Sequence, residues 1–393
     1  MDKFRYYLPT TIYFGKNEFE RIKKAASATG KNALIVIGQG SVKKLGYLKK
    51  LEDFLSKEGI KFDVFEGIEP NPRSKTINKA GEQARNIKAD MIIALGGGSV
   101  MDASKGIAIV AKTGHDIWDY CSTGDRKTKK ITEALPIICI PTLAATGSEV
   151  DGAAVISNHE TKQKAVIHNS IIIPKYAIID PMLTITVPRD YLVDGAVDII
   201  CHCFETYLSS TKMVSVPDQI TLGITRSVKN AIENILQDPE DIEQREILSW
   251  ASSIAMMGIF SGRSGGWPIH EIEHAISGIY DISHGLGLAV LMPAVLEFNT
   301  PHNEQKIKRL IGYLMHENTN HYTNIKDAIT DFKTWLKDIG AIRDLKKYGM
   351  DKINKEAVAD MAIDIYGHGN GYIYGVVPMY KNDIIEILEK AIG

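Results

Sequence analysis

Four short apolar runs, spaced through the first half of the chain, constrain its fold more than any other feature. They are ALIVI at 33–37, KFDVF at 61–65, DMIIAL at 90–95 and PIICI at 136–140. Each is rich in β-branched or aromatic residues, and amphipathic stretches follow the first three. Strands that alternate with helices favour parallel pairing through right-handed crossovers. The pattern therefore predicts an α/β domain with a parallel, Rossmann-like sheet.

The alternation of short apolar runs with amphipathic stretches ends in a segment with two prolines, residues 177–190. Beyond residue 189, apolar residues recur at i, i+3 and i+4, as in amphipathic helices, and no stretch convincingly predicts a strand. A length of 393 residues exceeds one typical core and favours two domains. We therefore expect an α/β domain over residues 1–186 and an all-helical domain over residues 187–393.

Charge and hydropathy narrow the classes of function. A net charge of −2, without a basic stripe, disfavours a nucleic-acid partner. No apolar run reaches the ~18 residues of a membrane helix. The charged and aromatic start, MDKFRYYLPTTIYFG, does not resemble a secretory signal. Four cysteines without a CxxC pair are typical of a reduced protein, so we expect a cytoplasmic location.

Two of the predicted strands end in glycine-rich turns that lead into helices, VIGQGSV at 36–42 and ALGGGSVMD at 94–102. Glycine allows a phosphate to approach the backbone, and the N–H groups at a helix start point towards an anion. A third segment, PTLAATGSE at 141–149, places hydroxyl residues after the fourth strand. Together the three segments predict a dinucleotide site at the carboxyl ends of the strands. Turns that need glycine only for tightness are the alternative.

A second set of polar residues lies in the helical half. Asp198 and His202 are four residues apart, as are His270 and His274, so each pair lies on one helix face. His284 follows a predicted break in the second helix. A carboxylate with two or three imidazoles is a ligand set for a divalent metal ion. The alternative is an amphipathic helix whose histidines are solvated, and spacing alone leaves both interpretations open.

Long stretches around these residues resemble one family. The segments GGGSVMDASK, PTLAATGSE, DIICHCFE and HEIEHAISGIYDISHGLGLAVLMP together are similar to the iron-containing (group III) alcohol dehydrogenases. The resemblance spans essentially the whole chain, and the histidine-rich segment is its most specific part. GQGSVKKLG after the first strand is most similar to the branch of butanol dehydrogenases and NADPH-dependent aldehyde reductases. The resemblance implies a dehydroquinate synthase-like architecture, with dinucleotide bound by the first domain and metal by the second, catalytic one.

The resemblance also assigns site residues, position by position. The family's metal ligands fall on Asp198, His202, His270 and His284, with Fe²⁺ as the favoured ion and Zn²⁺ as the alternative. His274 matches a histidine that the family keeps beside the nicotinamide and substrate, and we expect it to act in catalysis. The cofactor-binding positions are Gly38, Gly40, Ser41, Gly96, Gly97, Gly98, Ser99, Asp102, Thr142, Leu143, Thr146, Ser148 and, in a loosely matching segment, Lys164.

The implied activity is reversible hydride transfer between a primary, butanol-like alcohol and its aldehyde, with a nicotinamide cofactor. The apolar segment 251–270 favours a short aliphatic substrate over a polyol such as glycerol, which stays an alternative. A dehydroquinate synthase-like lyase would need several Lys and Arg residues near the metal helices, and this segment has one arginine. A binding protein with a dead site would lack a metal ligand, and none is missing. We expect a homodimer that binds small alcohols or aldehydes.

The first glycine turn bears on the choice of nicotinamide cofactor. NAD-specific sites commonly place a carboxylate at the adenosine ribose, where it repels a 2′-phosphate. In NAD-dependent relatives, the resemblance puts such an aspartate where this chain has Gly38. Lys43 and Lys44 follow one turn later and could offset the charge of a phosphate. We therefore expect NADP(H) to be preferred over NAD(H).

Overall fold

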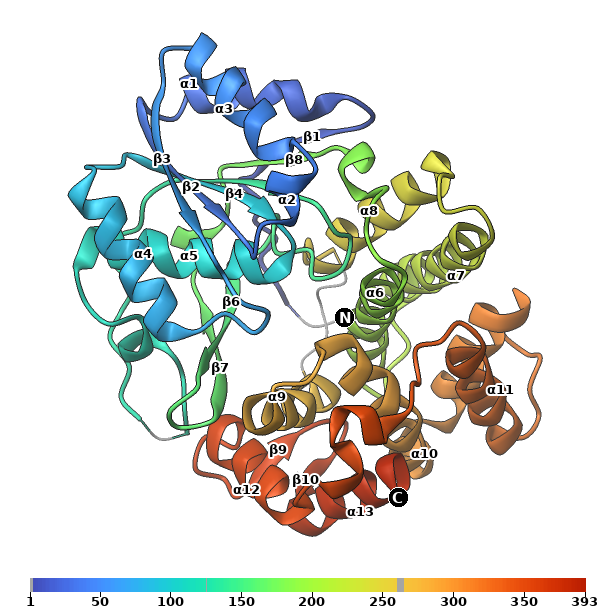
Figure 1. The fold of residues 1–393 in the computed structure, drawn as a ribbon. Helices are drawn as coiled ribbons and strands as arrows, with labels where there is room; N and C mark the ends of the chain where they lie inside the picture. The colour runs from blue at the N-terminus through green and yellow to red at the C-terminus, as the bar shows by residue number, and fades with distance from the viewer. Residues whose placement is uncertain (1–2, 125, 260–264) are drawn as a thin grey trace. The chain divides into compact units, whose positions relative to one another are not determined.

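The computed structural model describes residues 3–124, 126–259 and 265–393, which fall into two compact units (Figure 1). The N-terminal unit comprises Tyr7–Ser122 and Arg126–Val187. The C-terminal unit comprises Pro188–Gly393 together with two short segments, Met1–Tyr6 and Thr123–Asp125. The main division of the chain thus lies at Val187–Pro188. The two short segments join the C-terminal unit in a way that sequence periodicity does not predict.

The N-terminal unit is built on a six-stranded sheet with the order β1-β8-β5-β4-β2-β3. Every neighbouring pair in this sheet is parallel, which confirms the predicted α/β fold. The strands are β1 (Thr11–Phe14), β2 (Asn32–Ile37), β3 (Lys61–Glu66), β4 (Met91–Gly96), β5 (Ile137–Pro141) and β8 (Tyr176–Ile179).

Four strands of this unit lie outside the runs that predicted the fold. β1 and β8 are each four residues long, and β8 overlaps the proline-containing segment that seemed to end the domain. β6 (Ala153–Asn158) and β7 (Gln163–His168) form an antiparallel hairpin separate from the main sheet. Strands of four residues, such as β1 and β8, are too short to show a clear period in the sequence.

The central strands are buried on both faces, which explains their continuous apolar sequences. Alternate residues, among them Ile35, Ile93 and Ile138, pack in one core with residues of α1 and α3. α5 packs along β4 and β5. Each Ile or Leu buried in this way contributes about 1.5–3 kcal/mol. The helices are α1 (Ile22–Ser27), α2 (Ser41–Lys44), α3 (Tyr47–Lys57), α4 (Ser74–Asn86) and α5 (Gly98–Thr113).

Parallel pairing brings the carboxyl ends of β2, β4 and β5 to one edge of the sheet. Residues 38–41 follow β2, residues 96–99 close β4 and begin α5, and residues 142–148 follow β5. The three segments predicted to bind a dinucleotide therefore share the edge at which such folds bind ligands.

Over its described residues, the C-terminal unit consists of helices, connecting segments and one small hairpin. The prediction of an all-helical half therefore holds in class but misses β9 (Tyr372–Tyr374) and β10 (Pro378–Tyr380), which pair antiparallel. Strands of three residues are too short to show a period of two. The helices are α6 (Arg189–Leu208), α7 (Ser215–Gln237), α8 (Ile242–Met256), α9 (Pro268–Tyr280), α10 (His284–His316), α11 (Ile325–Asp338), α12 (Lys355–Tyr366) and α13 (Lys381–Ile392).

The break in the histidine-rich region lies between α9 and α10, at residues 281–283. Asp281 adopts a left-handed conformation with φ of 52°, which ends α9. Ser283 has an extended backbone and takes the N-cap position of α10. His284 is therefore the first residue of a new helix and does not continue the face that carries the two earlier histidines.

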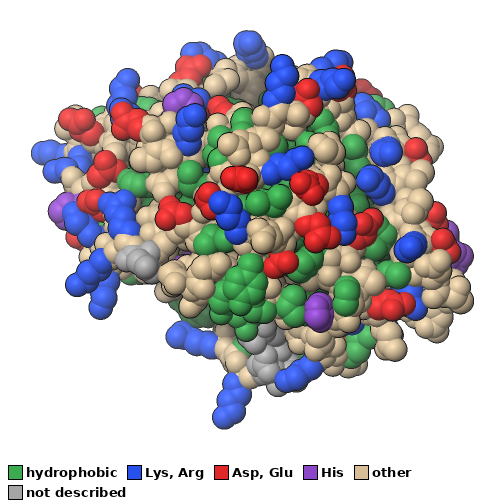
Figure 2. Space-filling model, turned by 90° about the horizontal axis from the view of Figure 1, so that it is seen from below, with side chains coloured by type: hydrophobic (Ala, Val, Ile, Leu, Met, Phe, Trp, Pro, Cys, Tyr) green, Lys and Arg blue, Asp and Glu red, His purple; other side chains and the backbone are tan. Residues whose placement is uncertain are grey.

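Charged side chains are interspersed on the face drawn in Figure 2, where Lys and Arg residues lie among Asp and Glu residues. This distribution agrees with the net charge of −2. Among the described residues, no helix is both long enough and apolar enough to cross a membrane.

Candidate metal and nucleotide sites

The carboxylate of Asp198 is the point on which three imidazoles converge. Its Oδ1 atom lies 3.3 Å from Nε2 of His202 and 3.5 Å from Nε2 of His270. The Nε2 atom of His284 lies 3.7 Å from the same oxygen. The structure thus brings together all four residues predicted as metal ligands.

Three helices supply these side chains. Asp198 and His202 lie one turn apart on α6, His270 lies in the first turn of α9, and His284 begins α10. The first three hold their donor atoms within 4.8 Å of one another. The i, i+4 spacing on α6 therefore forms half of a convergent site, as the sequence predicts.

The spacing of these atoms fits a divalent ion. Around a tetrahedral ion with bonds of about 2.0–2.2 Å, ligand atoms lie roughly 3.3–3.6 Å apart. Oδ1 of Asp198 and Nε2 of His270 are buried and have no hydrogen-bond partner among the described residues. Because a buried polar atom without a partner costs free energy, its presence here indicates a cation site.

Burial and charge favour the metal-binding protonation states of His202 and Asp198, whereas at His270 burial lowers the pKa but Cys201, Glu205 and Asp198 raise it more, to well above its ordinary value. Burial lowers the pKa of His202 to about 4, so this imidazole is neutral at pH 7. Burial also raises the pKa of Asp198, but the three facing imidazoles lower it more, to below its ordinary value. A neutral imidazole and an ionised carboxylate are the forms that ligate a metal ion.

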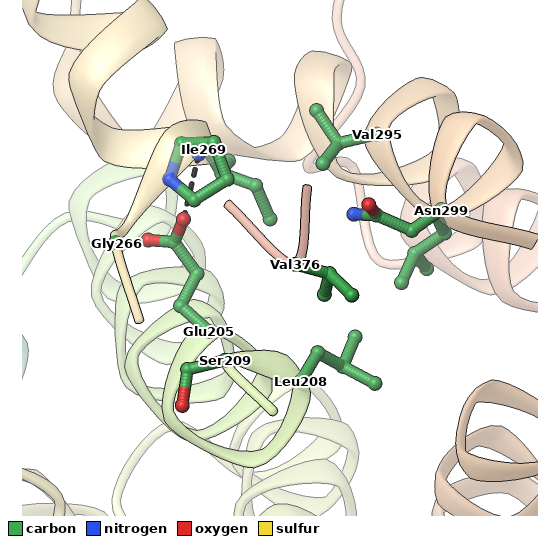
Figure 3. A pocket seen from close by; sticks show the side chains of 10 residues that line it. Glu205, Leu208, Ser209, Gly266, Ile269, Val295, Asn299 and Val376 are labelled. Atoms are coloured by element: carbon green, nitrogen blue, oxygen red, sulfur yellow. Dashed lines mark hydrogen bonds between the residues drawn. The ribbon is translucent and has the colours of Figure 1, made fainter. Parts of the chain in front are cut away.

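Glu205, on the last turn of α6, orients His270. Its carboxylate accepts a hydrogen bond from Nδ1 of His270. It also accepts one from the backbone N–H of Ile269, at 2.6 Å, which Figure 3 draws as a dashed line. A carboxylate on Nδ1 leaves Nε2 as the nitrogen available to a metal. Glu205 also borders a cavity of about 20 Å³, whose wall includes Leu208 and Val295. Glu205 is buried, so water does not compete for these hydrogen bonds.

Glu273 has the same role at His284. Its Oε2 atom binds Nδ1 of His284. Gly287 packs on this side chain so closely that an added Cβ would lie 2.7 Å from Cγ of Glu273. Sequence reasoning missed both glutamates, because a sequence shows acids near histidines but not which ring each acid faces.

His274 lies one turn after His270, but its hydrogen bond is to a tyrosine. Nδ1 of His274 lies 2.6 Å from the hydroxyl of Tyr366, the last residue of α12. Its ring centroid is 5.4 Å from that of His284 and 6.0 Å from that of His270. With Glu273 and His284, it forms a second group of donor atoms within 4.8 Å. His274 therefore lies next to the candidate metal site.

Part of the apolar segment 251–270, residues 260–264, lies outside the described residues. Within the described part, Trp267 lies against two of the predicted ligands. Its ring centroid is 5.5 Å from that of His202 and 5.3 Å from that of His270. The indole thus gives the site an apolar wall that the ligand pattern did not identify.

In the N-terminal unit, the glycine turn after β4 and the loop after β5 pack against each other. The backbone N–H of Thr142 donates to the carbonyl of Gly96 at 3.0 Å. An added Cβ on Gly98 would lie 2.4 Å from Cγ2 of Thr146, so close approach of the two segments requires glycine here. The predicted phosphate loop and the hydroxyl-rich loop therefore form one surface at the start of α5. The same two segments contain Gly97, Ser99 and Leu143.

Asp102 and Ser148 join these segments through a buried hydrogen bond of 2.6 Å. Asp102 also accepts from the backbone N–H of Val155, at 2.9 Å. Lys105 donates to Ser148 at 2.8 Å and pairs with Asp151 at 2.6 Å. Burial raises the pKa of Asp102 to about 6, although Lys105 and the two hydrogen bonds lower it. Sequence reasoning missed Lys105 and Asp151, because a lysine on a helix is ordinarily solvated.

The turn after β2 carries Gly38, Gly40 and Ser41. Gly40 has a φ of 97°, which other L-residues rarely adopt, whereas an added Cβ on Gly38 would make only ordinary van der Waals contacts. Lys43 forms an ion pair of 2.9 Å with Glu66, the last residue of β3. One of the two lysines expected to offset a phosphate therefore already has an acidic partner.

Lys164 is the predicted cofactor residue that lies outside the three turns. It belongs to β7, where it stands opposite Ser157 of β6. Its side chain is buried. The β6–β7 hairpin packs against α5, so Lys164 belongs to an element that neighbours the predicted phosphate loop. Its role towards the cofactor stays a prediction.

Two family models match the chain over nearly its full length. The model for iron-containing alcohol dehydrogenase matches residues 9–181. The model for the C-terminal part of the Fe-containing alcohol dehydrogenase family matches residues 192–392.

Curated relatives and solved structures agree with these matches. The chain is 35% identical to NADH-dependent butanol dehydrogenase A of Clostridium acetobutylicum, over 100% of both chains. It is 31% identical to NADPH-dependent aldehyde reductase YqhD of Escherichia coli, over 89% of this chain and 90% of that one. The structure of NADH-dependent butanol dehydrogenase A from Thermotoga maritima has a TM-score of 0.93, with 32% identity, covering 100% of this chain and 99% of that one.

Proposed function

The chain belongs to the iron-containing alcohol dehydrogenase family, and we propose that it is a metal-dependent enzyme that interconverts a primary, butanol-like alcohol and its aldehyde with NAD(P)H. The observation that carries this proposal is the convergence of three imidazole Nε2 atoms on one oxygen of Asp198. Relatives named as butanol dehydrogenase and aldehyde reductase support the class of substrate.

Asp198, His202, His270 and His284 would hold one divalent ion. A mixed oxygen and nitrogen donor set suits both Fe²⁺ and Zn²⁺. The name of the matching family model supports Fe²⁺, and Zn²⁺ stays the alternative. When bound, the ion supplies a Lewis acid for the substrate oxygen, and the nicotinamide exchanges the hydride.

The protein's own groups orient these ligands and line the site. Glu205 and Glu273 each occupy Nδ1 of a ligand histidine, which directs Nε2 towards Asp198. The carboxylates also make the imidazoles better donors. Trp267 packs beside two of the rings and adds an apolar wall to the site.

Alcohol oxidation releases the hydroxyl proton, which has to reach solvent. His274 is suited to carry it, because it lies next to the metal site and its Nδ1 is already hydrogen-bonded to Tyr366. A histidine can hold a proton on either nitrogen, and the tyrosine hydroxyl can both accept and donate. We assign proton transfer to His274 and a supporting role to Tyr366.

The start of α5 would hold the cofactor's pyrophosphate. Gly97 has no side chain to cover the first N–H groups of the helix, and Ser99 lies in its first turn, while Gly96 and Gly98 allow Val100 and Thr146 to pack closely against this turn. Thr142 and Thr146 add hydroxyl groups from the adjoining loop. A buried hydrogen bond from Ser148 to Asp102 joins the two segments.

The preference for NADP(H) remains part of the proposal. It is supported by Gly38, which leaves the ribose end without the carboxylate that NAD-specific sites use. Among the relatives, four butanol dehydrogenases are named for NADH, whereas one aldehyde reductase is named for NADPH and one alcohol dehydrogenase for NADP, so the relatives' names do not support this preference. The Glu66 partner of Lys43 limits this preference, since a 2′-phosphate has to compete with that carboxylate for the lysine.

Small aliphatic alcohols and aldehydes are the proposed partners. This class is supported by the apolar segment 251–270 and by the relatives' names. The homodimer and the cytoplasmic location stay predictions from the sequence, and light scattering of the purified protein would test the first of them.

The direct test is turnover by purified protein loaded anaerobically with Fe²⁺ or Zn²⁺. Butanal, 1-butanol and glycerol would be compared, each with phosphorylated and unphosphorylated nicotinamide cofactor. We expect butanal reduction and butanol oxidation, with higher kcat/KM for NADPH than for NADH. Activity on glycerol alone would favour the polyol alternative, and no turnover with either metal would contradict the proposed function. Strong selectivity for NADH would contradict the cofactor preference alone.

A further inference from the structure

His284 begins a helix of its own, so its position depends on what holds the start of α10 against α6. The other three predicted ligands lie within α6 or in the first turn of α9, where Glu205 ties the two helices together. The distance from Nε2 of His284 to Oδ1 of Asp198, 3.7 Å, is the longest of the three. A contact that fixes the start of α10 would therefore act on the one predicted ligand that lies on neither α6 nor α9.

Asp194, one turn before Asp198 on α6, provides that contact. The hydroxyl of Ser283 donates to Oδ2 of Asp194. Gly285 lies so close to the same residue that an added Cβ would be 2.5 Å from Cβ of Asp194 and 2.6 Å from its carbonyl oxygen. Ser283 and Gly285 flank His284 in the chain, so the position of Asp194 sets the position of His284.

Arg343 in turn fixes the carboxylate of Asp194. Its Nη2 atom lies 2.6 Å from Oδ1 and 2.9 Å from Oδ2 of Asp194. Its Nη1 atom lies 3.6 Å from Oδ2 of Asp190, one turn earlier on α6. The side chains of Arg343 and Asp194 are only 14% and 11% exposed. Loss of the guanidinium would leave a largely buried carboxylate without its cation, which favours a different side-chain position.

We propose that Arg343 is a positioning residue for the metal site: it holds Asp194, and through Ser283 it keeps His284 directed at the bound ion. The consequence is a higher affinity for the divalent ion than the four ligands alone would give. This inference rests on the proposed function in one respect, the assignment of His284 as a ligand. Arg343 touches neither ion nor substrate in this account, and acts only through Asp194.

The test is the affinity for Zn²⁺, measured on metal-stripped protein by competition with a chromogenic chelator. Arg343→Gln removes the charge and the planar fork. We expect it to weaken Zn²⁺ binding by about 10- to 100-fold, the range typical of groups that orient metal ligands. Arg343→Lys should weaken binding less, because an ammonium keeps the charge beside Asp194 but has no second nitrogen to face Asp190 as Nη1 does.

The Arg343→Gln substitution is then also made in a His284→Ala variant. This comparison distinguishes an effect on the position of His284 from an effect on the stability of the whole protein. If Arg343 acts through His284, adding Arg343→Gln to His284→Ala should change Zn²⁺ affinity by less than about twofold. Arg189→Gln is the matched control. Arg189 is the first residue of α6, the helix that carries Asp194. It donates to the carbonyl of Ile339 at 3.1 Å, and Ile339 lies in the connection after α11, as Arg343 does. Its replacement should leave Zn²⁺ affinity unchanged.

Two results would overturn the inference while leaving the metal site in place. One is unchanged Zn²⁺ affinity in Arg343→Gln. The other is an equal loss in both backgrounds, which would mean that Arg343 supports the unit as a whole. Undiminished binding by His284→Ala would instead refute the ligand assignment in the proposed function. Should Arg343→Gln fail to fold, Ser283→Ala removes only the hydroxyl link and is expected to give the same pattern in the two backgrounds.

Discussion

Glu205, near the end of α6, binds Nδ1 of His270, in the first turn of α9, and so leaves only Nε2 of that ring for a metal ion. Glu205→Gln keeps the size of the side chain but removes the charge that favours a protonated Nδ1. We expect metal affinity to fall by about 10- to 100-fold, measured by chelator competition. Glu297→Gln, at an exposed position of α10, is the control. Equal affinity of Glu205→Gln and wild type would show that the carboxylate only caps α9.

His274→Ala should keep the metal and slow the reaction. Removal of a general acid–base group typically lowers rates by about 10²–10⁴-fold. The dependence of kcat on pH should change as well, because the group that carries the proton is gone. Tyr366→Phe should shift the same profile with a smaller loss of rate, since it removes the hydroxyl that holds Nδ1 of His274. If His274→Ala loses its metal, the ligands have been assigned wrongly.

Glu66→Gln should increase the preference for NADPH. The carboxylate holds Lys43 in an exposed ion pair of 2.9 Å beside the turn at Gly40. Without it, the lysine is available to a 2′-phosphate, and a negative charge near that phosphate is removed. We expect kcat/KM for NADPH to rise about threefold or more relative to that for NADH. Lys43→Gln should shift the ratio in the opposite direction. An unchanged ratio in both variants would place the ribose end of the cofactor elsewhere.

Asp102 should make the stability of the protein depend on pH. Burial raises its pKa from 3.8 to about 6 in the folded state, so the folded state binds this proton more tightly than the unfolded chain does. The resulting stabilisation is fully present below pH 3.8 and is lost as the pH rises through 6. Relative to Asp102→Asn, the wild-type free energy of unfolding should fall by up to about 3 kcal/mol between pH 4 and 7.

Denaturant unfolding of both proteins across that pH range would measure the difference. Asp102→Asn also changes hydrogen bonds with Ser148 and Val155, but these add an offset that is independent of pH. A difference between the two proteins that stays constant from pH 4 to pH 7 would contradict the prediction.

The sequence predicts those parts of the protein that depend on local patterns. Continuous apolar runs identify β2, β4 and β5 because these strands are buried on both faces. The spacing of Asp198 and His202 predicts half of the proposed metal site because residues four apart share a helix face. The family resemblance extends this to the ligands on α9 and α10. Strands as short as β9 and β10, with three residues each, cannot show a period of two in the sequence.

The groups that support the site could not be predicted, because each acts across elements. Glu205 faces His270 only once α6 and α9 are packed, and Arg343 reaches Asp194 from the connection that follows α11. Lys105 looks like an exposed helix residue in the sequence, yet it is completely buried against Asp151. Local patterns contain no information on which partner a charged side chain meets in the folded chain.

The central claim, that the four converging residues bind a catalytic divalent ion, is tested most directly by metal content and turnover in His270→Ala. Protein prepared anaerobically with Fe²⁺ would be assayed for bound metal, for butanal reduction and, by circular dichroism, for helix content. We predict one bound ion per wild-type chain, and loss of ion and turnover together in His270→Ala, with helix content retained. A metal-free His270→Ala protein with wild-type turnover would contradict the claim.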